Sequence, residues 1–417
     1  MRQSGISPEK IDSILDDTVK SHVQTRSQTR KGSDVFVAET KGFRRVDFTV
    51  KYWDESNFDL NYGEWTDLLK ESNCDRLFMS WGWHRTWWQD YKTDRSTLCI
   101  IAVYEGGVLL ALAPMYLEKS FYVKGLVPVR RLQFIGKRFR GLSGIRGEYL
   151  NFIVRTDRSD AVLPVLIEAI CKDRRWDELV LEDSSIDEKT YSLFAASLIA
   201  MGCRRRIDGC EPTYVVDCTT SFDDYLASLG RNTRLRFYNR RKLLEQMGTV
   251  TLVPLTEDNK HEFFETFNEF HQKRWGLQFP KQAQQFLISI FSLEQSDMTL
   301  AQSSFLKLDD RPVSVMLNAM VNSRIYNIQL GYLEDFDKRI SVGTLHLGYQ
   351  IEKAFNDTDV LYFDLLAGPG KNTNFKSQLA KEYITLCSMR WSRSFLLKCF
   401  FTMLNGFRRI FPNARLS

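Results

Sequence analysis

The spacing of hydrophobic residues predicts helices and strands in a fixed order along the first half of the chain. Apolar residues three and four positions apart predict helices at residues 64–69 and 81–91. Two apolar runs, 97–104 and 108–116, flank Glu105-Gly106-Gly107 and predict a β-hairpin. The pattern continues with predicted strands at 131–135, 149–154, 178–182 and 214–217 and predicted helices at 161–171 and 189–201.

The second half repeats this order. The predicted helices lie at 260–275, 282–291, 343–355 and 373–380, and the predicted strands at 299–308, 313–321, 324–332, 360–366 and 383–389. Each half therefore has helices, then a hairpin-rich sheet, then a helix that crosses to another strand. This repetition predicts an α+β fold of two tandem domains, each a mixed, mostly antiparallel sheet flanked by helices.

The pattern also suggests where these parts begin and end. The predicted segments are a flexible N-terminal tail (1–45), an N-terminal domain (46–220), a basic connecting helix (221–246), a C-terminal domain (247–394) and an amphipathic C-terminal helix (395–417). The last segment combines Phe and Leu with basic residues, so it can dock on the protein or lie on a membrane surface.

Composition narrows the function classes. The 417 residues are 43% hydrophobic and 26% charged, as in globular proteins, and the net charge of +5 suits a small anionic ligand better than a nucleic acid. The eight cysteines form no C-x-x-C pair and the five histidines do not cluster near them, which argues against a metal site or a disulfide framework. Buried thiols, and a start without an apolar signal-peptide core, predict a cytoplasmic protein.

One stretch, KRISVGTLHLGYQ at residues 338–350, can hold a phosphate. It follows the predicted strand 324–332 and opens a predicted helix. The first N–H groups of a helix lack internal partners and lie at the positive end of its dipole, so they bind anions. The alternative is that Ser341 and its neighbours simply cap the helix.

This stretch resembles the pyrophosphate loop of the GNAT acyltransferase superfamily, whose pattern is Q/R-x-x-G-x-G/A. Here Lys338 stands first and Ser341 replaces the first glycine. The resemblance implies an acyl-CoA, acetyl-CoA first of all, as co-substrate and no metal. The residues that it assigns to the cofactor are Lys338, Arg339, Ile340, Ser341, Val342, Gly343 and Thr344.

The wider pattern is similar to the two-domain CelD-type branch, which is associated with cellulose and exopolysaccharide and related to the Fem peptidyltransferases. The similar stretches, over residues 75–390, are SWGWHRTWWQDY, LLALAPMYL, RLQFIG, LGRNTRLRFYNRRKLLEQMG, Arg274-Trp275, IQLGYLEDFDKRISVGTLHL and Phe375-Lys376. Both halves of the chain are then GNAT-like domains, and residues 247–394 are the one that binds acyl-CoA.

Direct acyl transfer needs a base, a polarised thioester and a proton for the leaving thiolate. Asp364, in the predicted strand LYFDLL, is the candidate base, or else a salt-bridged strand end. Tyr332 can donate to the thiolate or pack as a sheet aromatic. The Fem-like resemblance places Phe375 at the substrate and Lys376 at the oxyanion; Lys376 can also be an ordinary surface lysine.

The basic segment is the candidate acceptor site. We expect Leu235, Tyr238, Leu243 and Leu244 to face the core and Arg236 and Arg240 to face an anionic partner. That partner can be a sugar nucleotide, the phosphopantetheine arm of an acyl carrier protein or the CoA phosphates. RNA is disfavoured because the segment lacks a stacking platform. The tryptophans at 81–88, and His84 and His346, are predicted to be structural.

The sequence thus predicts a transferase, an acyl-CoA-dependent N-acetyltransferase of the GNAT type. Its acceptor is an amine or hydroxyl of a sugar-linked molecule or polysaccharide precursor, which suggests exopolysaccharide biosynthesis. Two alternatives stay open: a Fem-like aminoacyltransferase that uses charged tRNA, and a degenerate GNAT pair that acts as a binding scaffold. No transmembrane segment is predicted, and peripheral membrane contact is compatible with the sequence.

Overall fold

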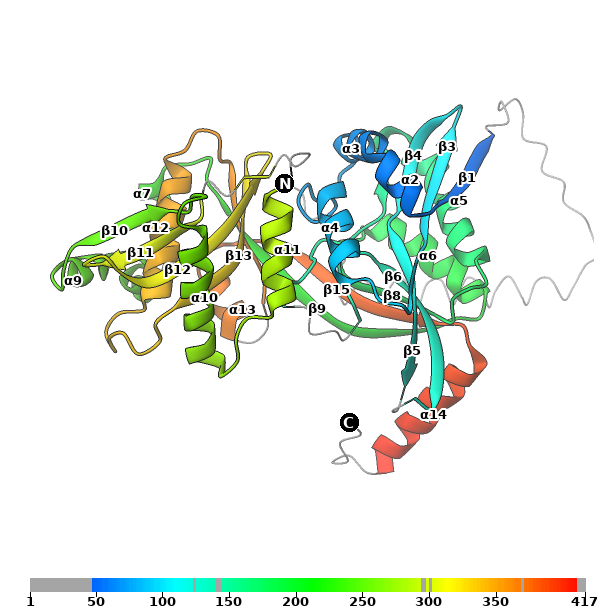
Figure 1. The fold of residues 1–417 in the computed structure, drawn as a ribbon. Helices are drawn as coiled ribbons and strands as arrows, with labels where there is room; N and C mark the ends of the chain where they lie inside the picture. The colour runs from blue at the N-terminus through cyan, green and yellow to red at the C-terminus, as the bar shows by residue number, and fades with distance from the viewer. Residues whose placement is uncertain are drawn as a thin grey trace, which may run out of the picture. The chain divides into compact units, whose positions relative to one another are not determined.

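The structure is a computed structural model that describes residues 47–122, 125–139, 144–293, 298–299, 302–368 and 371–410. The predicted tail at 1–45 and residues 411–417 lie outside these ranges. The described chain divides into two compact units (Figure 1). The first contains residues 47–139, 147–210 and 385–410, and the second contains residues 144–146 and 211–384.

The first unit has two groups of paired strands. One has the order β1-β3-β4-β7, and the other includes β8-β6-β5-β2 beside part of β15. Their bounds are β1 Phe48–Trp53, β2 Ser96–Leu98, β3 Ile100–Glu105, β4 Val108–Ala113, β5 Met115–Tyr122, β6 Val127–Phe134, β7 Ile153–Val154, β8 Glu178–Ser184 and β15 Glu382–Ser392. The helices are α2 Glu55–Leu60, α3 Tyr62–Lys70, α4 Trp81–Tyr91, α5 Ser159–Lys172, α6 Glu188–Ala200 and α14 Phe395–Ile410, with the short 3-10 turn η1 Thr156–Arg158.

The predicted hairpin at 97–116 is present but interrupted. Each of its strands breaks once, at Cys99 and at Pro114, so that β3 and β4 pair in one group and β2 and β5 pair in the other. Proline has no N–H to donate to a ladder, which suits the break at Pro114. The prediction of two unbroken strands was wrong because sequence spacing does not show which sheet a strand enters.

The tryptophan-rich helix α4 forms the core of the first unit, as predicted. Trp83, Trp87 and Trp88 are at most 1% exposed, and His84 is fully buried. Ser80 caps the helix by accepting a hydrogen bond from the Trp83 amide at 3.1 Å. Burial lowers the pKa of His84 to about 4, so this histidine is a neutral core residue.

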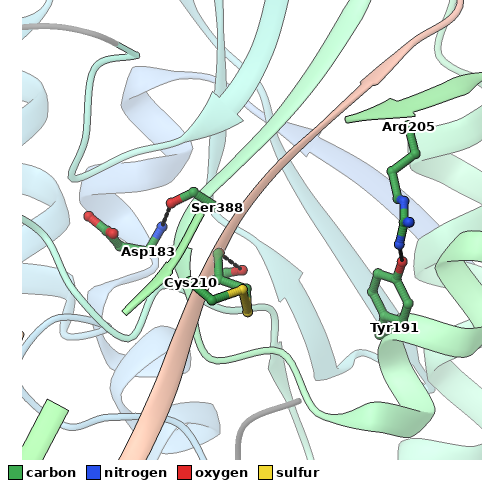
Figure 2. The surroundings of a disulfide bond; sticks show 7 residues. Asp183, Tyr191, Arg205, Cys210 and Ser388 are labelled. Atoms are coloured by element: carbon green, nitrogen blue, oxygen red, sulfur yellow. Dashed lines mark hydrogen bonds between the residues drawn. A yellow bond between two sulfur atoms is a disulfide. The ribbon is translucent and has the colours of Figure 1, made fainter. Parts of the chain in front are cut away.

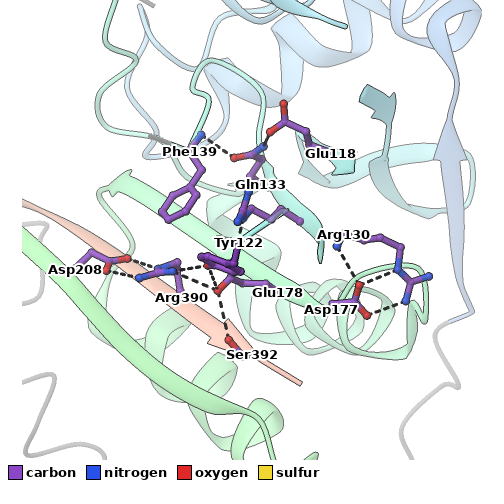
Figure 3. A network of polar contacts seen from close by, with 11 residues as sticks. Glu118, Tyr122, Arg130, Gln133, Phe139, Asp177, Glu178, Asp208, Arg390 and Ser392 are labelled. Atoms are coloured by element: carbon purple, nitrogen blue, oxygen red, sulfur yellow. Dashed lines mark hydrogen bonds and ion pairs between the residues drawn. The ribbon is translucent and has the colours of Figure 1, made fainter. Parts of the chain in front are cut away.

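A buried ion network joins five strands of the first unit (Figure 3). The fully buried Glu178 carboxylate accepts from Tyr122 Oη at 2.7 Å and from Arg131 Nε at 3.0 Å. Arg390, 1% exposed, donates to Tyr122 Oη at 2.6 Å and to Asp208 Oδ1 at 2.7 Å. A buried charge is tolerated only when it is paired, and these contacts link β5, β6, β8, β15 and the strand β9, Arg204–Asp217.

The second unit is a mixed sheet with the order β10-β11-β12-β13-β14-β9. The strands are β9 Arg204–Asp217, β10 Val250–Pro254, β11 Ser304–Leu308, β12 Arg311–Val321, β13 Arg324–Tyr332 and β14 Tyr362–Ala367. The helices are α7 Phe222–Ser228, α8 Arg231–Arg234, the π-helical η2 Leu235–Asn239, α9 Arg241–Glu245, α10 Lys260–Trp275, α11 Lys281–Phe291, α12 Val342–Phe355 and α13 Lys371–Lys376. Among the described strand pairs of this unit, only β13 and β14 are parallel, which confirms the predicted mixed, mostly antiparallel α+β fold.

The segment predicted as one connecting helix is four short helical pieces, α7 to α9, inside the second unit. The π turn of η2 adds a residue to the helix and changes which side chains face inward. Phe237 is therefore fully buried, and Leu235, predicted to face the core, is 36% exposed. Arg241 is also buried, because it pairs with Glu352 and stacks on the Tyr349 ring at 3.8 Å.

A disulfide joins Cys210 of β9 to Cys387 of β15 within the first unit (Figure 2). The prediction that the cysteines remain thiols was wrong for this pair, because cysteines 177 positions apart in sequence meet only through strand pairing. The chain enters the second unit directly after Cys210 and leaves it at Thr385. Both transitions fall inside strands, β9 and β15. The domain limits predicted at residues 220 and 394 therefore differ from the limits of the second unit.

Candidate acyl-transfer site

The parallel strands β13 and β14 separate shortly after they begin. Their pairing joins only residues 324–326 of β13 to residues 362–364 of β14. Beyond Tyr326, β13 continues to Tyr332 and pairs with β12 alone. The carboxyl ends of the two strands thus diverge, and such ends of parallel strands are where α/β sheets bind ligands.

Both strands are also irregular at this place. Gln329 and Asn327 of β13 pair with the adjacent residues Leu317 and Asn318, so Ile328 bulges out of the ladder. In β14 the pairing with β9 skips Leu365 and Leu366, and Leu366 has a positive φ of 57°. Bulges interrupt the ladder and occur often beside active sites.

Nine residues separate the end of β13 from the start of helix α12, and the first turn of this helix resembles an anion site. Its N-cap residue, Ser341, makes no capping hydrogen bond; its hydroxyl lies 2.9 Å from that of Thr344. The first turn has no acidic residue to offset the positive end of the helix dipole. Val342 and Gly343 are buried, while Ser341 and Thr344 are half-buried.

The predicted loop residues before the helix differ in role. Lys338 and Arg339 are exposed, and Ile340 is buried. Arg339 donates to Asp337 at 2.9 Å, and this contact lowers the pKa of the Asp337 carboxyl to about 2. Arg240 lowers it further through space. Leu244 of the basic segment packs with Ile340 and Val342 in one core cluster, so the basic segment and the loop before α12 lie close together.

Tyr332 lies against Gly343. A Cβ atom added to Gly343 would come within 2.6 Å of the Tyr332 ring, so a larger residue there would force the ring to move. Arg274 stacks on the same ring at 5.0 Å and forms an ion pair with Glu334 at 2.9 Å. The sequence indicates Arg274 only as part of an Arg-Trp pair, and its contact with Tyr332 could not be predicted because α10 is far from the loop in sequence.

Asp364 is fully buried, and both of its carboxylate oxygens accept hydrogen bonds. Arg324 donates to its Oδ2 at 2.5 Å, and the Leu366 amide donates to its Oδ1 at 2.8 Å. This is the environment of a salt-bridged strand, one of the two roles considered for Asp364. The carboxylate fixes the start of the β14 bulge.

Lys376 binds the backbone of the β14 bulge. Its ammonium donates to the carbonyl oxygens of Leu366 and Ala367, both at 2.9 Å. This cation is therefore held at the carboxyl end of β14, where the two strands diverge. Phe375 is half-buried and packs against the core cluster beneath the sheet.

His346, on α12, is structural, as predicted. It is fully buried, with Nε2 2.9 Å from Ser304 Oγ and Nδ1 2.9 Å from Ser314 Oγ. Burial lowers its pKa to about 3, so it is neutral and cannot reach a substrate.

The first unit also has a pair of parallel strands, but the helix start between them carries acidic residues. Its parallel strands β6 and β8 also share three paired positions. However, Asp157 and Asp160 lie at the start of η1 and α5, and Arg158 pairs with Glu105. At the end of β8, burial raises the pKa of Glu182 to about 7. Carboxylates at a helix start repel phosphate, so of these two helix starts the one in the second unit is better suited to an anion.

Residues 231–377 match the family model of an acetyltransferase (GNAT) domain. The match covers the basic segment, the diverging strands, the α12 start and Lys376. The GNAT acyltransferase fold is thus present in the second unit. Among the described residues, no group of three or more His, Cys, Asp or Glu is arranged to hold a metal ion.

Solved structures resemble most of the chain at low identity. The crystal structure of FemX is 13% identical with a TM-score of 0.51, over 79% of this chain and 95% of that chain. A tandem GNAT protein from the clavulanic acid biosynthesis pathway is 12% identical with a TM-score of 0.44, over 84% and 99%. L-PGS from Bacillus licheniformis is 13% identical with a TM-score of 0.45, over 83% and 97%. Such likenesses concern the fold alone, and no curated protein matches the sequence.

Proposed function

We propose that this protein is an acyltransferase that moves an acyl group, in the first instance acetyl, from acyl-CoA to an amine or hydroxyl. The acceptor is a sugar-linked molecule or polysaccharide precursor, as the motifs similar to the CelD-type branch suggest. The observation that carries the acyl-CoA proposal is the divergence of β13 from β14 beside a helix start without a carboxylate. The amides of residues 341–344 would hold the pyrophosphate, because the Ile340 amide donates to the Asp337 carbonyl at 3.0 Å, and Lys338 and Arg339 would add charge.

The proposed chemistry is direct transfer. The acceptor attacks the thioester carbonyl, the new C–N or C–O bond forms, the C–S bond breaks, and the acceptor's proton leaves to solvent or to the thiolate. Lys376 is the residue that we assign to the oxyanion, because its ammonium is fixed at the end of β14. Tyr332 is the proposed donor to the thiolate. Asp364 is better suited as a positioning residue than as the base, because Arg324 and the Leu366 amide occupy its oxygens.

A charge substitution at the helix start tests the cofactor site. Ser341→Asp should stabilise or preserve the protein, since aspartate is a good N-cap, yet repel the pyrophosphate. We expect CoA affinity, measured by calorimetry, to fall at least about tenfold. Ser341→Asn is the matched control, because it has the same shape without the charge. Equal CoA affinity in the two folded variants would refute the phosphate-loop assignment.

The donor is tested by one pair of melting curves. A ligand that binds the native state raises the melting temperature, so acetyl-CoA in large excess should stabilise an acyl-CoA enzyme. No stabilisation would favour the Fem-like tRNA-dependent alternative or the scaffold. Binding of aminoacyl-tRNA would then separate these two.

A further inference from the structure

Helix α14 packs on the β5–β6 hairpin of the first unit through only part of its surface. Leu397 is buried with Tyr122 and Val129, and the Phe400 ring lies 5.7 Å from the Tyr122 ring. Thr402 accepts a hydrogen bond from Arg204 at 2.9 Å. These contacts hold α14 against the hairpin at one end of the unit (Figure 1).

Large apolar side chains remain exposed on both elements. On α14, Phe395, Leu396 and Met403 are 77%, 68% and 67% exposed. Leu396 and Met403 are seven residues apart and so lie on one side of the helix. On the hairpin, Leu126 is 78% exposed at the turn, while Phe121 lies on the face opposite to the one that Tyr122 presents to α14. We call Phe395, Leu396, Met403 and Leu126 the apolar patch; single exposed apolar residues are common, but a group on two packed elements indicates a binding surface.

The charged residues of α14 are all basic. The helix contains Lys398, Arg408 and Arg409 and no acidic residue. On the hairpin Lys119 is exposed, whereas Arg130 pairs with Asp177 and Arg131 belongs to the buried ion network. Apolar side chains combined with lysine and arginine are typical of helices that lie in the interface of an anionic membrane.

We propose that the β5–β6 hairpin and α14 form a membrane-surface site that binds anionic lipid headgroups and inserts the apolar patch at the interface. No helix among the described residues is long and apolar enough to cross a bilayer, so the contact would be peripheral. A second copy of the chain suits the patch less well. A two-fold interface would bring two cationic surfaces together, at an electrostatic cost.

Vesicle flotation of the full chain tests the proposal. We expect binding to vesicles of equimolar phosphatidylcholine and phosphatidylglycerol and much weaker binding to phosphatidylcholine alone. Added salt should weaken the binding because it screens the headgroups. The triple variant Leu126→Ser, Leu396→Ser, Met403→Ser should bind the anionic vesicles at least about tenfold more weakly, because apolar side chains leave the interface.

The matched control is Leu277→Ser, a residue of the second unit that is 72% exposed. It should bind vesicles like the wild type, and all variants should keep the wild-type melting temperature because the replaced side chains are exposed. Equal binding to anionic and neutral vesicles, or equal binding by the triple variant and the control, would overturn the proposal. Failure to bind vesicles, with a wild-type dimer that the triple variant loses, would assign the patch to a second copy instead.

Discussion

Lys376 is the residue on which the proposed chemistry depends most directly. Its ammonium is positioned by two carbonyl oxygens of the β14 bulge. If it stabilises the oxyanion, Lys376→Met should lower kcat about a hundredfold and leave the KM for acyl-CoA nearly unchanged. Lys338→Met, in the exposed loop, should instead raise that KM. Full activity of a folded Lys376→Met variant would remove Lys376 from the site.

His346 should make the second unit sensitive to acid. Its folded pKa of about 3 lies below the unfolded value near 6.5, so the unfolded state binds more protons and stability falls as the pH drops below about 6.5. At pH 5 the free energy of unfolding is about 2 kcal/mol lower than at neutral pH because of this histidine, and His346→Gln should abolish that loss. Urea unfolding of both proteins at pH 7 and pH 5 measures the difference. Identical losses in the wild type and the variant would contradict the assignment; His84 contributes equally to both.

At the scale of elements, the basic segment and the loop before α12 act together. Arg240 influences Asp337 of that loop, whereas Arg236 is exposed and its Nε lies 3.4 Å from the Asn232 carbonyl. We therefore expect Arg240→Ala to weaken CoA binding severalfold, more at low salt than at high salt. Arg236→Ala should leave CoA binding unchanged and weaken binding of the acceptor. Equal, small effects of the two substitutions on CoA binding and on acceptor binding would indicate that the basic segment is only a solvent-exposed surface.

The elements that the sequence predicted best are those with long local patterns. The strand and helix on either side of the loop appear within a residue of their predicted ends, as β13 and α12. The phosphate-loop hypothesis came from this local order. The environment of Asp364 could not be predicted, because Arg324 reaches it only through the pairing of β13 with β14. The inward turn of Phe237 depends on a π turn that no spacing rule indicates.

At the scale of the whole molecule, the second unit is largely an insertion in the first. Residues 211–384 leave and re-enter the first unit within three residues of the cysteines that form the disulfide. Composition could not mark these boundaries, because they fall inside strands rather than in a polar linker. The bridge between Cys210 and Cys387 thus closes a loop that contains nearly all of the second unit.

This closure leads to a prediction about stability. Cross-linking residues 177 positions apart restricts the unfolded chain, and in the loop-entropy model this stabilises the protein by about 5 kcal/mol at most, with 2–4 kcal/mol typical of disulfides. A reductant, or Cys210→Ser, should therefore lower the free energy of unfolding, measured by urea titration, by a similar amount. Cys399→Ser, at a free and half-buried thiol, is the control and should leave the free energy of unfolding unchanged. If the reductant has no effect on the wild type, the bond does not form in solution and the two cysteines act as packed thiols.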